Sequence, residues 1–479
     1  MHLLFLLLAL QQPAEKPAEP GPSAPEPSAL THDLFGVNID RAGDLDGDGI
    51  EDLWVGDPSL SGADDGRHSC VWAVSGSTGK AIRRIAAPRE SLGFGATVCS
   101  LDDIDGDGVR EVAIGCQFLG PGEDYRWRDA IGQTSPPGEG AVFLYSGAEG
   151  SLRWVVHGAA DEFKIPWYTA AAGPTLCPVG DWNDDGVEDL AVGWSYGNSD
   201  VQDCGRVEVV SGADGELLQS WSGSEAYDRL GTVLCAVGDL DGDGRTELAA
   251  TAWPNRKRGE EGPYSHRHAT GYVRVLSSTG GALTTLRPAD EGRCFGLSLA
   301  VLPDGEDGTR GGLLVGHPFF GDSRASIQLW SPHEGKLLRS FDKPSIEDWS
   351  GGQKYPYQPP PEEVDLSFGA RLLVVPDRDG DGLADLLVTV PEGFPTVPAG
   401  VLSSATEQSL ARLHLERNNY VFIGLASCGM ADLDGDAFSD FALGGASVPC
   451  GDSCYAAVLL VSGKELVPIR TIVGAELRR

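Results

Sequence analysis

The chain has 479 residues and a formal net charge of −35 at pH 7, from 71 acidic and 36 basic side chains. This charge argues against a nucleic-acid-binding surface, because such surfaces gather lysine and arginine. The 65 glycines and 31 prolines are typical of a turn-rich, all-β structure.

The N-terminus is predicted to be a targeting segment rather than part of the fold. Residues 3–10 form an apolar run that is too short to span a bilayer, so we expect residues 1–10 to contain the core of a signal peptide. Residues 11–30 are rich in Pro, Ala and Glu, and we expect a disordered spacer there. No transmembrane segment is predicted, and the protein is expected outside the cytoplasm: secreted, periplasmic or at the cell surface.

One motif, Asp-x-Asp-x-Asp-Gly-x-x-Asp, recurs along residues 31–479. Six copies are well formed, and a degraded seventh begins at Asp304. A glycine precedes every copy by eight residues, and self-similarity at such a period indicates a repeat architecture. The well-formed copies begin at Asp44, Asp103, Asp181, Asp239, Asp377 and Asp432, and the glycines are Gly36, Gly95, Gly173, Gly231, Gly296, Gly369 and Gly424.

Each well-formed copy has the composition of a calcium loop. The acidic or amide side chains at positions 1, 3, 5 and 9 can converge from one tight turn, and the residue at position 7 can offer its carbonyl. Calcium takes roughly 6–8 oxygen ligands in flexible geometry, whereas magnesium requires a stricter octahedron. We therefore predict about six calcium sites. The predicted ligands are Asp44, Asp46, Asp48, Ile50 and Asp52; Asp103, Asp105, Asp107, Val109 and Glu111; Asp181, Asn183, Asp185, Val187 and Asp189; Asp239, Asp241, Asp243, Arg245 and Glu247; Asp377, Asp379, Asp381, Leu383 and Asp385; Asp432, Asp434, Asp436, Phe438 and Asp440.

Two copies depart from the pattern. The last has Ala437 where the others have glycine, so we expect a strained turn there. The degraded copy keeps Asp304 and Glu306 but has Gly308 and Gly312 at positions 5 and 9, and we expect no metal in it.

Two other interpretations fit the motif less well. A single Asp-Gly-rich stretch could be a solvated turn, but six in register argue against that. An EF-hand or dockerin loop would need an acidic residue at position 12 and flanking helices. Position 12 is instead apolar and lies in a short apolar run, which predicts a buried strand. These residues are Val55, Ile114, Val192, Ala250, Val388 and Leu443.

The sequence between successive loops predicts the rest of each repeat. A strand ending in glycine is followed by a variable stretch, a second alternating strand, a tight turn such as Ser77-Thr78-Gly79, and a last strand. Four strands repeated seven times fit an all-β fold, a seven-bladed β-propeller of four-stranded antiparallel blades.

The motifs Phe35-Gly36, Phe94-Gly95, Phe295-Gly296 and Phe368-Gly369, each followed by an Asp loop or its remnant, resemble FG-GAP repeats. The resemblance covers about residues 34–479. It implies the propeller of integrin α subunits and of many secreted bacterial proteins, with calcium in its loops. It implies a fold and a metal more strongly than a function, since one fold hosts many functions.

Propeller topology places the predicted partner surface. The first and third turns of a four-stranded meander lie on one face, and the second turn and the blade connection lie on the other. Long insertions with aromatic residues occupy second turns at residues 117–139 and 252–270 and a connection at residues 343–363. Binding residues collect in such loops, so we expect a protein or glycan partner on the face opposite the calcium loops. Alternatively, the insertions cap the central channel.

We expect a monomeric, non-catalytic binding or adhesion module. The sequence has no His-Glu-x-x-His motif, P-loop or dinucleotide glycine motif. The pair His266 and His268 is interpreted as surface histidines. A propeller enzyme of the quinoprotein or lyase kind and a structural cell-surface protein are the alternatives.

The ten cysteines sort by repeat position. Four lie four residues before a loop start, inside the first strand, and are expected to be buried thiols: Cys99, Cys177, Cys235 and Cys428. Cys450 and Cys454 are the best candidates for a disulfide. Sequence alone cannot pair the remaining cysteines, Cys70, Cys116, Cys204 and Cys294.

Overall fold

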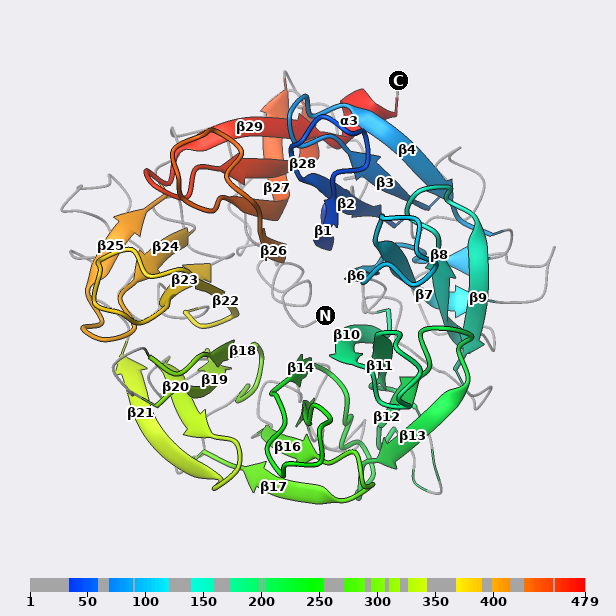
Figure 1. Cartoon of the computed structure of the whole chain (residues 1–479), viewed down its shortest axis with the longest axis vertical. Helices are drawn as coiled ribbons and strands as arrows, with labels where there is room; N and C mark the ends of the chain where they lie inside the picture. Colours follow the sequence, from blue (N-terminus) through cyan, green and yellow to red (C-terminus); the bar gives the residue numbers. More distant parts are fainter. Residues whose placement is uncertain are drawn as a thin grey trace, which may run out of the picture.

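The computed structural model describes residues 34–58, 69–88, 91–119, 139–158, 173–197, 199, 201, 203–253, 271–288, 294–305, 310–318, 326–342, 368–389, 399–413, 426–450 and 453–478. Across these ranges the strands form seven sheets that are arranged as a ring (Figure 1). The predicted seven-bladed β-propeller is confirmed. We number the blades 1 to 7 in chain order.

Each blade is an antiparallel meander whose four strands follow one another from the centre of the ring to its rim (Figure 1). The innermost strands are β1 (Ile39–Gly43), β6 (Thr97–Leu101), β10 (Thr175–Gly180), β14 (Leu234–Ala236), β18 (Leu299–Leu302), β22 (Arg371–Val375) and β26 (Ala426–Gly429). The second strands are β2 (Asp52–Asp57), β7 (Glu111–Leu119), β11 (Asp189–Trp194), β15 (Leu248–Ala252), β19 (Gly312–His317), β23 (Asp385–Thr389) and β27 (Phe441–Cys450). The third strands are β3 (Cys70–Val74), β8 (Glu139–Tyr145), β12 (Arg206–Val210), β16 (Tyr272–Leu276), β20 (Ser326–Ser331), β24 (Ala399–Leu402) and β28 (Ser453–Val461). The outer strands are β4 (Ala81–Ala86), β9 (Leu152–His157), β13 (Leu217–Ser222), β17 (Ala282–Leu286), β21 (Lys336–Asp342), β25 (Ser409–Arg412) and β29 (Pro468–Val473).

Two further elements complete the described part. A two-residue strand, β5 (Ser91–Leu92), pairs with β7. A short helix, α3 (Gly474–Leu477), follows the last outer strand.

The burial of the strands explains their sequences. The second strands are apolar without alternation because neighbouring blades cover both of their faces, and every residue of β2 is buried. The outer strands have one face in solvent, so β4 is largely exposed or half-buried and holds Ile85 as its one buried residue. The core therefore lies between the blades. Between blades 1 and 2, for example, Trp54 and Val71 pack with Phe94 and Ile114.

The repeated Phe-Gly pair locks adjacent blades together. Phe35, Phe94 and Phe295 are completely buried. Gly95 lies against the end of the second strand of the preceding blade, where a Cβ atom on Gly56 would clash with the carbonyl oxygen of Gly95. The glycines before the loops and those that end the second strands thus meet across blade interfaces, where a side chain would not fit.

Blade 7 closes the ring by packing against blade 1, and none of the described strands is exchanged between them. All four strands of either blade are consecutive in sequence. Phe35, Val55 and Trp72 of the first blade share a core cluster with Val458 and Ile472 of the last. Beyond α3, the guanidinium group of Arg478 pairs with Asp57 at 2.5 Å. The guanidinium carbon lies 5.9 Å from the centre of the Phe35 ring.

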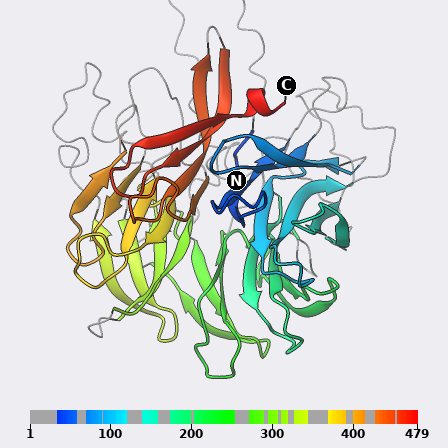
Figure 2. The ribbon, with the colours of Figure 1, turned by 45° about the horizontal axis from the view of Figure 1, so that its top comes forward.

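The second and third strands of blade 7 are long and project beyond the ring (Figure 2). Their register pairs Cys450 with Ser453 and Cys454 with Pro449. The side chains of both cysteines lie outside the described part, so their disulfide stays a prediction. The four thiols expected in the first strands are free: Cys99 and Cys428 are buried, and Cys177 and Cys235 are half-buried against the core. Cys70 and Cys204 are also free and are buried, and Cys116 and Cys294 are buried as well.

Several predictions fall on residues outside the described part. They are the targeting segment and the spacer in residues 1–30, nearly all of the three insertions, and both His266 and His268. The expected partner surface therefore stays a prediction.

Candidate metal centres

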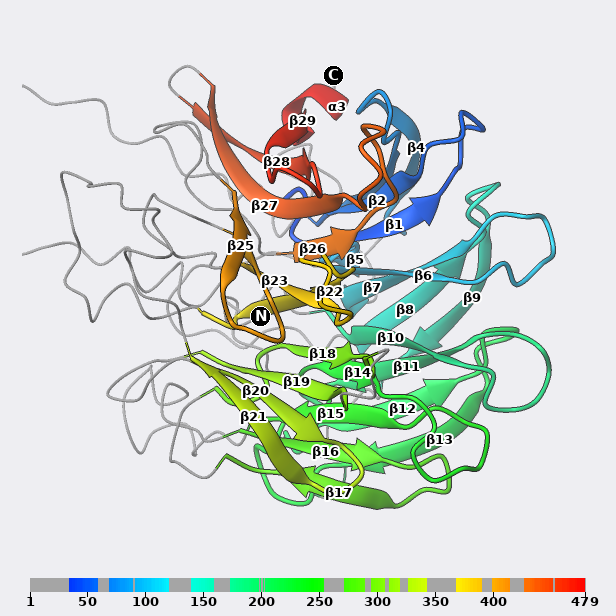
Figure 3. The same cartoon turned by 60° about the vertical axis from the view of Figure 1, so that its left-hand side comes forward.

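The six well-formed Asp motifs connect the first and second strands of their blades. We call them the cation loops: residues 44–52, 103–111, 181–189, 239–247, 377–385 and 432–440. The third turn of a blade, between its third and outer strands, lies beside the cation loop on the same face of the ring (Figure 3). Hydrogen bonds join the two, as from Gly76 N–H to Asp52 Oδ1 at 3.0 Å in blade 1 and from Gly212 N–H to Asp189 Oδ1 at 3.0 Å in blade 3.

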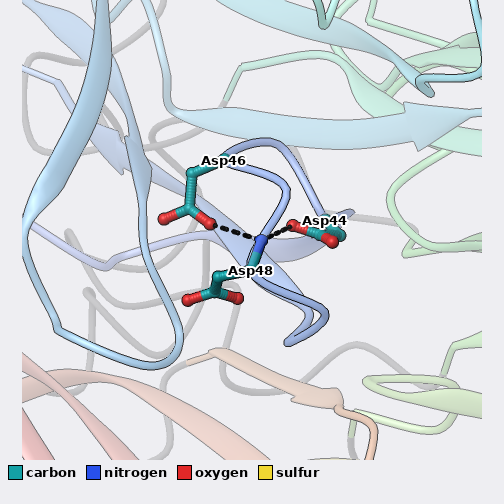
Figure 4. Close-up of side chains that lie close together, drawn as sticks. All are labelled: Asp44, Asp46 and Asp48. Atoms are coloured by element: carbon teal, nitrogen blue, oxygen red, sulfur yellow. Dashed lines mark hydrogen bonds between the residues drawn. The ribbon is translucent and has the colours of Figure 1, made fainter.

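The first aspartate organises each cation loop through backbone amides. In blade 1, Asp44 Oδ1 accepts from Gly47 N–H at 2.7 Å and from Asp48 N–H at 3.1 Å, while its Oδ2 accepts from Gly49 N–H at 2.8 Å. Asp46 Oδ1 also accepts from Asp48 N–H, so both carboxylates turn toward the same point (Figure 4). Such local bonds from aspartate compete with regular secondary structure and favour a turn.

These bonds also set the acidity of the first aspartate. Gly108 N–H donates to Asp103 and Gly382 N–H to Asp377, and these bonds hold the pKa of both carboxyls below its usual value. The fifth-position aspartate likewise accepts from the amide at position 7, at 2.9 Å between Asp48 and Ile50. These backbone hydrogen bonds favour the tight turn of each loop.

The ninth-position acid is fully buried in all six cation loops: Asp52, Glu111, Asp189, Glu247, Asp385 and Asp440. Where it is aspartate, one oxygen accepts from the amide at position 2 and the other from the third turn, as with Leu45 and Gly76 around Asp52. Burial raises the pKa of Asp52, Glu111 and Asp385 to about 6.

Glutamate at position 9 leaves an oxygen without a partner. Ile104 N–H donates to one oxygen of Glu111 at 2.8 Å, and Leu240 N–H donates to one oxygen of Glu247 at 2.5 Å. Within the described residues, Oε1 of either glutamate is buried and accepts no hydrogen bond. A buried carboxylate oxygen in that state is costly unless a cation or a donor meets it.

Five of the loops bring three carboxylate oxygens within 4.8 Å of one another. In blades 2, 4, 6 and 7 these belong to positions 1, 3 and 9, and in blade 1 to positions 1, 3 and 5. The groups are Asp44, Asp46 and Asp48; Asp103, Asp105 and Glu111; Asp239, Asp241 and Glu247; Asp377, Asp379 and Asp385; Asp432, Asp434 and Asp440.

The loop of blade 3 differs because its third position is an amide. Asn183 Nδ2 donates to Asp185 Oδ2 at 2.8 Å, and Asn183 Oδ1 accepts from Asp185 N–H at 3.1 Å. The fourth position is also unusual. Asp184 stands there at φ 63°, where the equivalent residues are glycines, and its carboxylate pairs with Arg245 of blade 4 at 3.0 Å.

A serine at the start of the third turn is a component that the sequence analysis missed. It recurs in all seven blades and is buried in each: Ser75, Ser146, Ser211, Ser277, Ser331, Ser403 and Ser462. Its hydroxyl donates to a cation-loop carboxylate in three blades, from Ser277 to Asp241 at 3.0 Å, Ser403 to Asp381 at 3.4 Å and Ser462 to Asp436 at 3.2 Å. Aligning the repeats through the third turn would have revealed it.

Blade 5 shows a different arrangement at the degraded motif. Gly311 N–H donates to Asp304 Oδ1 at 2.7 Å. Arg310, at position 7, pairs with Glu334 at 3.1 Å and donates to the third-turn serine Ser331 at 3.3 Å. A Cβ atom on Gly312 would clash with the carbonyl oxygen of Trp330, so this backbone has no room for an acid at position 9. Glu306 and Gly308 lie outside the described residues.

The donor set of the cation loops suits a hard divalent cation. All the gathered ligands are carboxylate oxygens, the class that calcium and magnesium prefer. The unpartnered buried oxygens of Glu111 and Glu247 fit the same assignment. The clusters could therefore hold divalent cations. Blade 2 contains a competitor, since Arg153 pairs with Asp105 at 2.6 Å.

One sequence pattern with a catalytic association is explained by the fold. Residues 193–197 read Gly-Trp-Ser-Tyr-Gly, which matches the Gly-x-Ser-x-Gly pattern of hydrolases. A nucleophile elbow leads from a strand into a helix. Ser195 instead follows β11 in the turn to β12, inside an antiparallel blade.

Among the described helices, none combines the length and the apolar character needed to cross a membrane. No protein-family model matches the chain. Its sequence is similar to integrin α subunits. Integrin alpha-4 of Xenopus laevis is 29% identical over 171 residues, 33% of this chain, and integrin alpha-V of Gallus gallus is 25% identical over 236 residues, 48% of this chain. The alignments span only 14% and 21% of those proteins.

A solved structure with a similar fold is rhamnogalacturonan lyase YesW, at 14% identity and a TM-score of 0.42, covering 88% of this chain and 73% of the lyase. At that TM-score the likeness carries no inference about function. The integrin similarity, together with the observed seven blades, confirms the resemblance to an integrin α propeller.

Proposed function

We propose that this chain is a calcium-stabilised, non-catalytic binding propeller that works outside the cytoplasm. The observation that carries the proposal is the repetition of one oxygen-rich loop, with a buried ninth-position acid, at the same place in six blades. Repetition in register indicates a role in the ring as a whole, since a reaction needs a single site.

The cation is assigned as calcium from the ligand chemistry. The cation loops offer carboxylates on a flexible turn, and calcium tolerates irregular geometry better than magnesium does. An extracytoplasmic location supplies calcium at concentrations that weak sites can use. The apolar segment in residues 3–10 and the similarity to integrin α subunits support that location.

Binding rather than catalysis is supported by the integrin similarity and by the division of the ring into two faces. One face carries the cation loops and the third turns. The long insertions, in sequence terms, belong to the opposite face, where a protein or glycan partner would bind.

Metal analysis tests the cation assignment. Protein equilibrated with calcium and then freed of excess should retain about six ions per chain, one for each cation loop. Three or fewer would show that the Asp motifs are ordinary turns. Asp304→Asn should leave the count unchanged, since blade 5 has no room for the ninth-position ligand.

The partner face is tested by loop replacement. Calcium-loaded protein is probed against a protein and glycan array, and residues 343–363 are then shortened to a glycine turn. We expect unchanged melting and weaker binding. If binding persists after all three insertions are removed, the partner uses another surface.

A further inference from the structure

Two cation loops carry a glutamate at position 8, between the predicted ligands at positions 7 and 9. Both glutamates are half-buried and reach the preceding blade of the ring. Glu51 of blade 1 accepts from Ala431 N–H of blade 7 at 2.7 Å. Glu188 of blade 3 accepts from Asp102 N–H of blade 2 at 2.8 Å.

The two glutamates accept from the same position of the neighbouring loop, the backbone amide just before its first predicted ligand. Ala431 directly precedes Asp432, the first predicted ligand in blade 7, and Asp102 directly precedes Asp103, the first in blade 2. Each glutamate is thus adjacent in sequence to two ligands of its own loop and is hydrogen-bonded to the backbone that positions the first ligand of its neighbour. The other cation loops have Arg110, Thr246, Ala384 and Ser439 at position 8.

We propose that Glu51 and Glu188 are positioning residues that couple neighbouring cation sites, blade 1 with blade 7 and blade 3 with blade 2. The inference rests on the proposed cation sites. A cation in one loop fixes the segment that carries the glutamate, and the hydrogen bond then restrains the first ligand of the next loop. The second cation has less ordering to do and binds more tightly. By linkage, either ion of a pair raises the affinity for the other by the same factor.

A second contact between neighbouring loops provides a contrast. Arg245 of blade 4 pairs with Asp184 of blade 3, but the Asp184 side chain is 84% exposed. Solvent-exposed ion pairs contribute little interaction free energy. Blades 3 and 4 should therefore show much weaker coupling than blades 2 and 3, although they are equally adjacent in the ring.

Blade 3 offers a site-specific readout. Trp182 occupies position 2 of its cation loop, and its backbone amide donates to Asp189 at 2.7 Å. Terbium(III) substitutes for calcium in oxygen sites and luminesces when a nearby tryptophan is excited. Trp182 packs against blade 4, so the full chain is titrated with terbium with and without the blade 4 changes Asp239→Asn and Asp241→Asn, and the signal that Trp182→Phe removes in both backgrounds is taken as the blade 3 signal.

The test is a double-mutant cycle. Asp103→Asn with Asp105→Asn disables the blade 2 site and should raise the apparent Kd of terbium at blade 3 on the order of fivefold. In a Glu188→Ala background the same pair of changes should have no effect. Glu188→Gln removes the charge but keeps an oxygen that can accept from Asp102 N–H, so it should retain part of the coupling. If the coupling depended on the charge of Glu188, Glu188→Gln would abolish it as Glu188→Ala does.

Two controls test whether the effect is specific to Glu188 and to the blade 2 site. Glu149→Ala removes an exposed acid from the third turn of blade 2, where its carboxylate contacts Ser151, and should leave the coupling intact. Asp239→Asn with Asp241→Asn disables the blade 4 site and should leave the blade 3 affinity within a factor of about two.

The possible outcomes distinguish a failure of the coupling from a failure of the cation sites themselves. If disabling blade 2 shifts the blade 3 affinity equally with and without Glu188, the sites interact through space and the positioning role is wrong. If it shifts nothing, the sites are independent and the inference falls while the cation sites remain. If the unmodified protein gives no saturable signal dependent on Trp182, blade 3 holds no cation and the inference falls, whereas the proposed function falls only if metal analysis also finds three or fewer ions per chain.

Discussion

At position 9 of the cation loops, aspartate and glutamate differ in the hydrogen bonds that the buried carboxylate accepts. Asp52 reaches two backbone donors, whereas Glu111 and Glu247, with one more methylene, each retain a buried oxygen without a donor among the described residues. Because a buried carboxylate is stable only when it is paired, the cation matters most in the two blades that carry glutamate.

The raised pKa of these acids predicts opposite pH profiles with and without calcium. In chelated protein, burial raises the pKa of Asp52, Glu111 and Asp385 to about 6, above the unfolded values of about 4. The folded state then binds protons more tightly than the unfolded state, so stability rises as the pH falls from 7 toward 5. Calcium-loaded protein should lose stability over the same range, because protons compete with the cation.

Below about pH 4 both forms should weaken. Carboxyls whose pKa is lowered by backbone amides, such as Asp103 and Asp377, become protonated there and lose those bonds. Melting temperatures measured from about pH 2 to 8 with calcium and with chelator check the prediction. Parallel profiles would show that the buried acids do not control the stability of the chelated ring.

Ala437 predicts a stabilising substitution. The expected strain at this residue is confirmed by its φ of 72°, in the region where the equivalent glycines lie. Ala437→Gly removes the steric cost of the Cβ but adds freedom to the unfolded chain, so we expect a net gain of about 0.5–1 kcal/mol in the free energy of unfolding. Gly49→Ala, at the same position of blade 1, should lose a similar amount. Denaturant melts measure both, and equal stabilities would locate the strain elsewhere.

Between elements, a side chain on the outer strand of blades 1, 2, 3 and 5 donates hydrogen bonds to carbonyl oxygens in the third turn of the next blade. We call this contact the clasp. Arg339 on β21 donates to the carbonyls of Ser404 at 2.6 Å and Ala405 at 2.7 Å in blade 6. Arg83 on β4 does the same to Gly147 and Ala148 in blade 2. Trp154 and Gln219 occupy the equivalent position in blades 2 and 3, and they donate to Gly212 and Ser278. Blade 6 has Ala411 there, and Arg378 from its cation loop donates to Gly463 and Lys464 instead.

The clasp predicts a cost for Arg339→Ala. The substitution removes two charge-assisted hydrogen bonds and the ion pair with Glu407 at 2.9 Å, so we expect a loss of about 1.5–3 kcal/mol in the free energy of unfolding. Arg412→Ala is the matched control: this outer-strand arginine bonds to Ser409 in its own blade, and its loss should cost less than about 0.5 kcal/mol. Equal losses would mean that the clasp contributes nothing beyond the arginine stem.

The sequence predicted the elements better than the contacts between them. Apolar runs and the fixed glycine offset were enough for the strands, the blade count and the position of the cation loops, because these depend on local pattern. The third-turn serines were missed since a single serine is common in any turn and its partner lies in another hairpin. The cross-blade bonds of Glu51, Glu188 and Arg339 depend on which residues face each other across an interface, and one sequence does not show that.

For the whole ring, calcium should be a main source of stability. Each site at 100-fold saturation contributes about 2.7 kcal/mol by mass action, so a few such sites match the net stability of a typical domain, about 5–15 kcal/mol. Chelation should lower the melting temperature by tens of degrees. Asp239→Ala with Asp241→Ala should produce part of this loss, since the other cation loops remain. If chelated and loaded proteins melt within a few degrees of each other in calorimetry, the ring is held by β-packing alone.

Because none of the described strands is exchanged at the closure, the order of synthesis affects which surfaces are covered. A blade built from one continuous segment can complete its hydrogen bonds as soon as that segment leaves the ribosome. Its apolar faces, however, are covered only by its neighbours. The face of blade 1 that holds Val55 and Trp72 is covered by Val458 and Ile472 of blade 7, the last to be made. That surface therefore stays open throughout translation, and a nascent chain stalled before residue 426 should recruit chaperones through it.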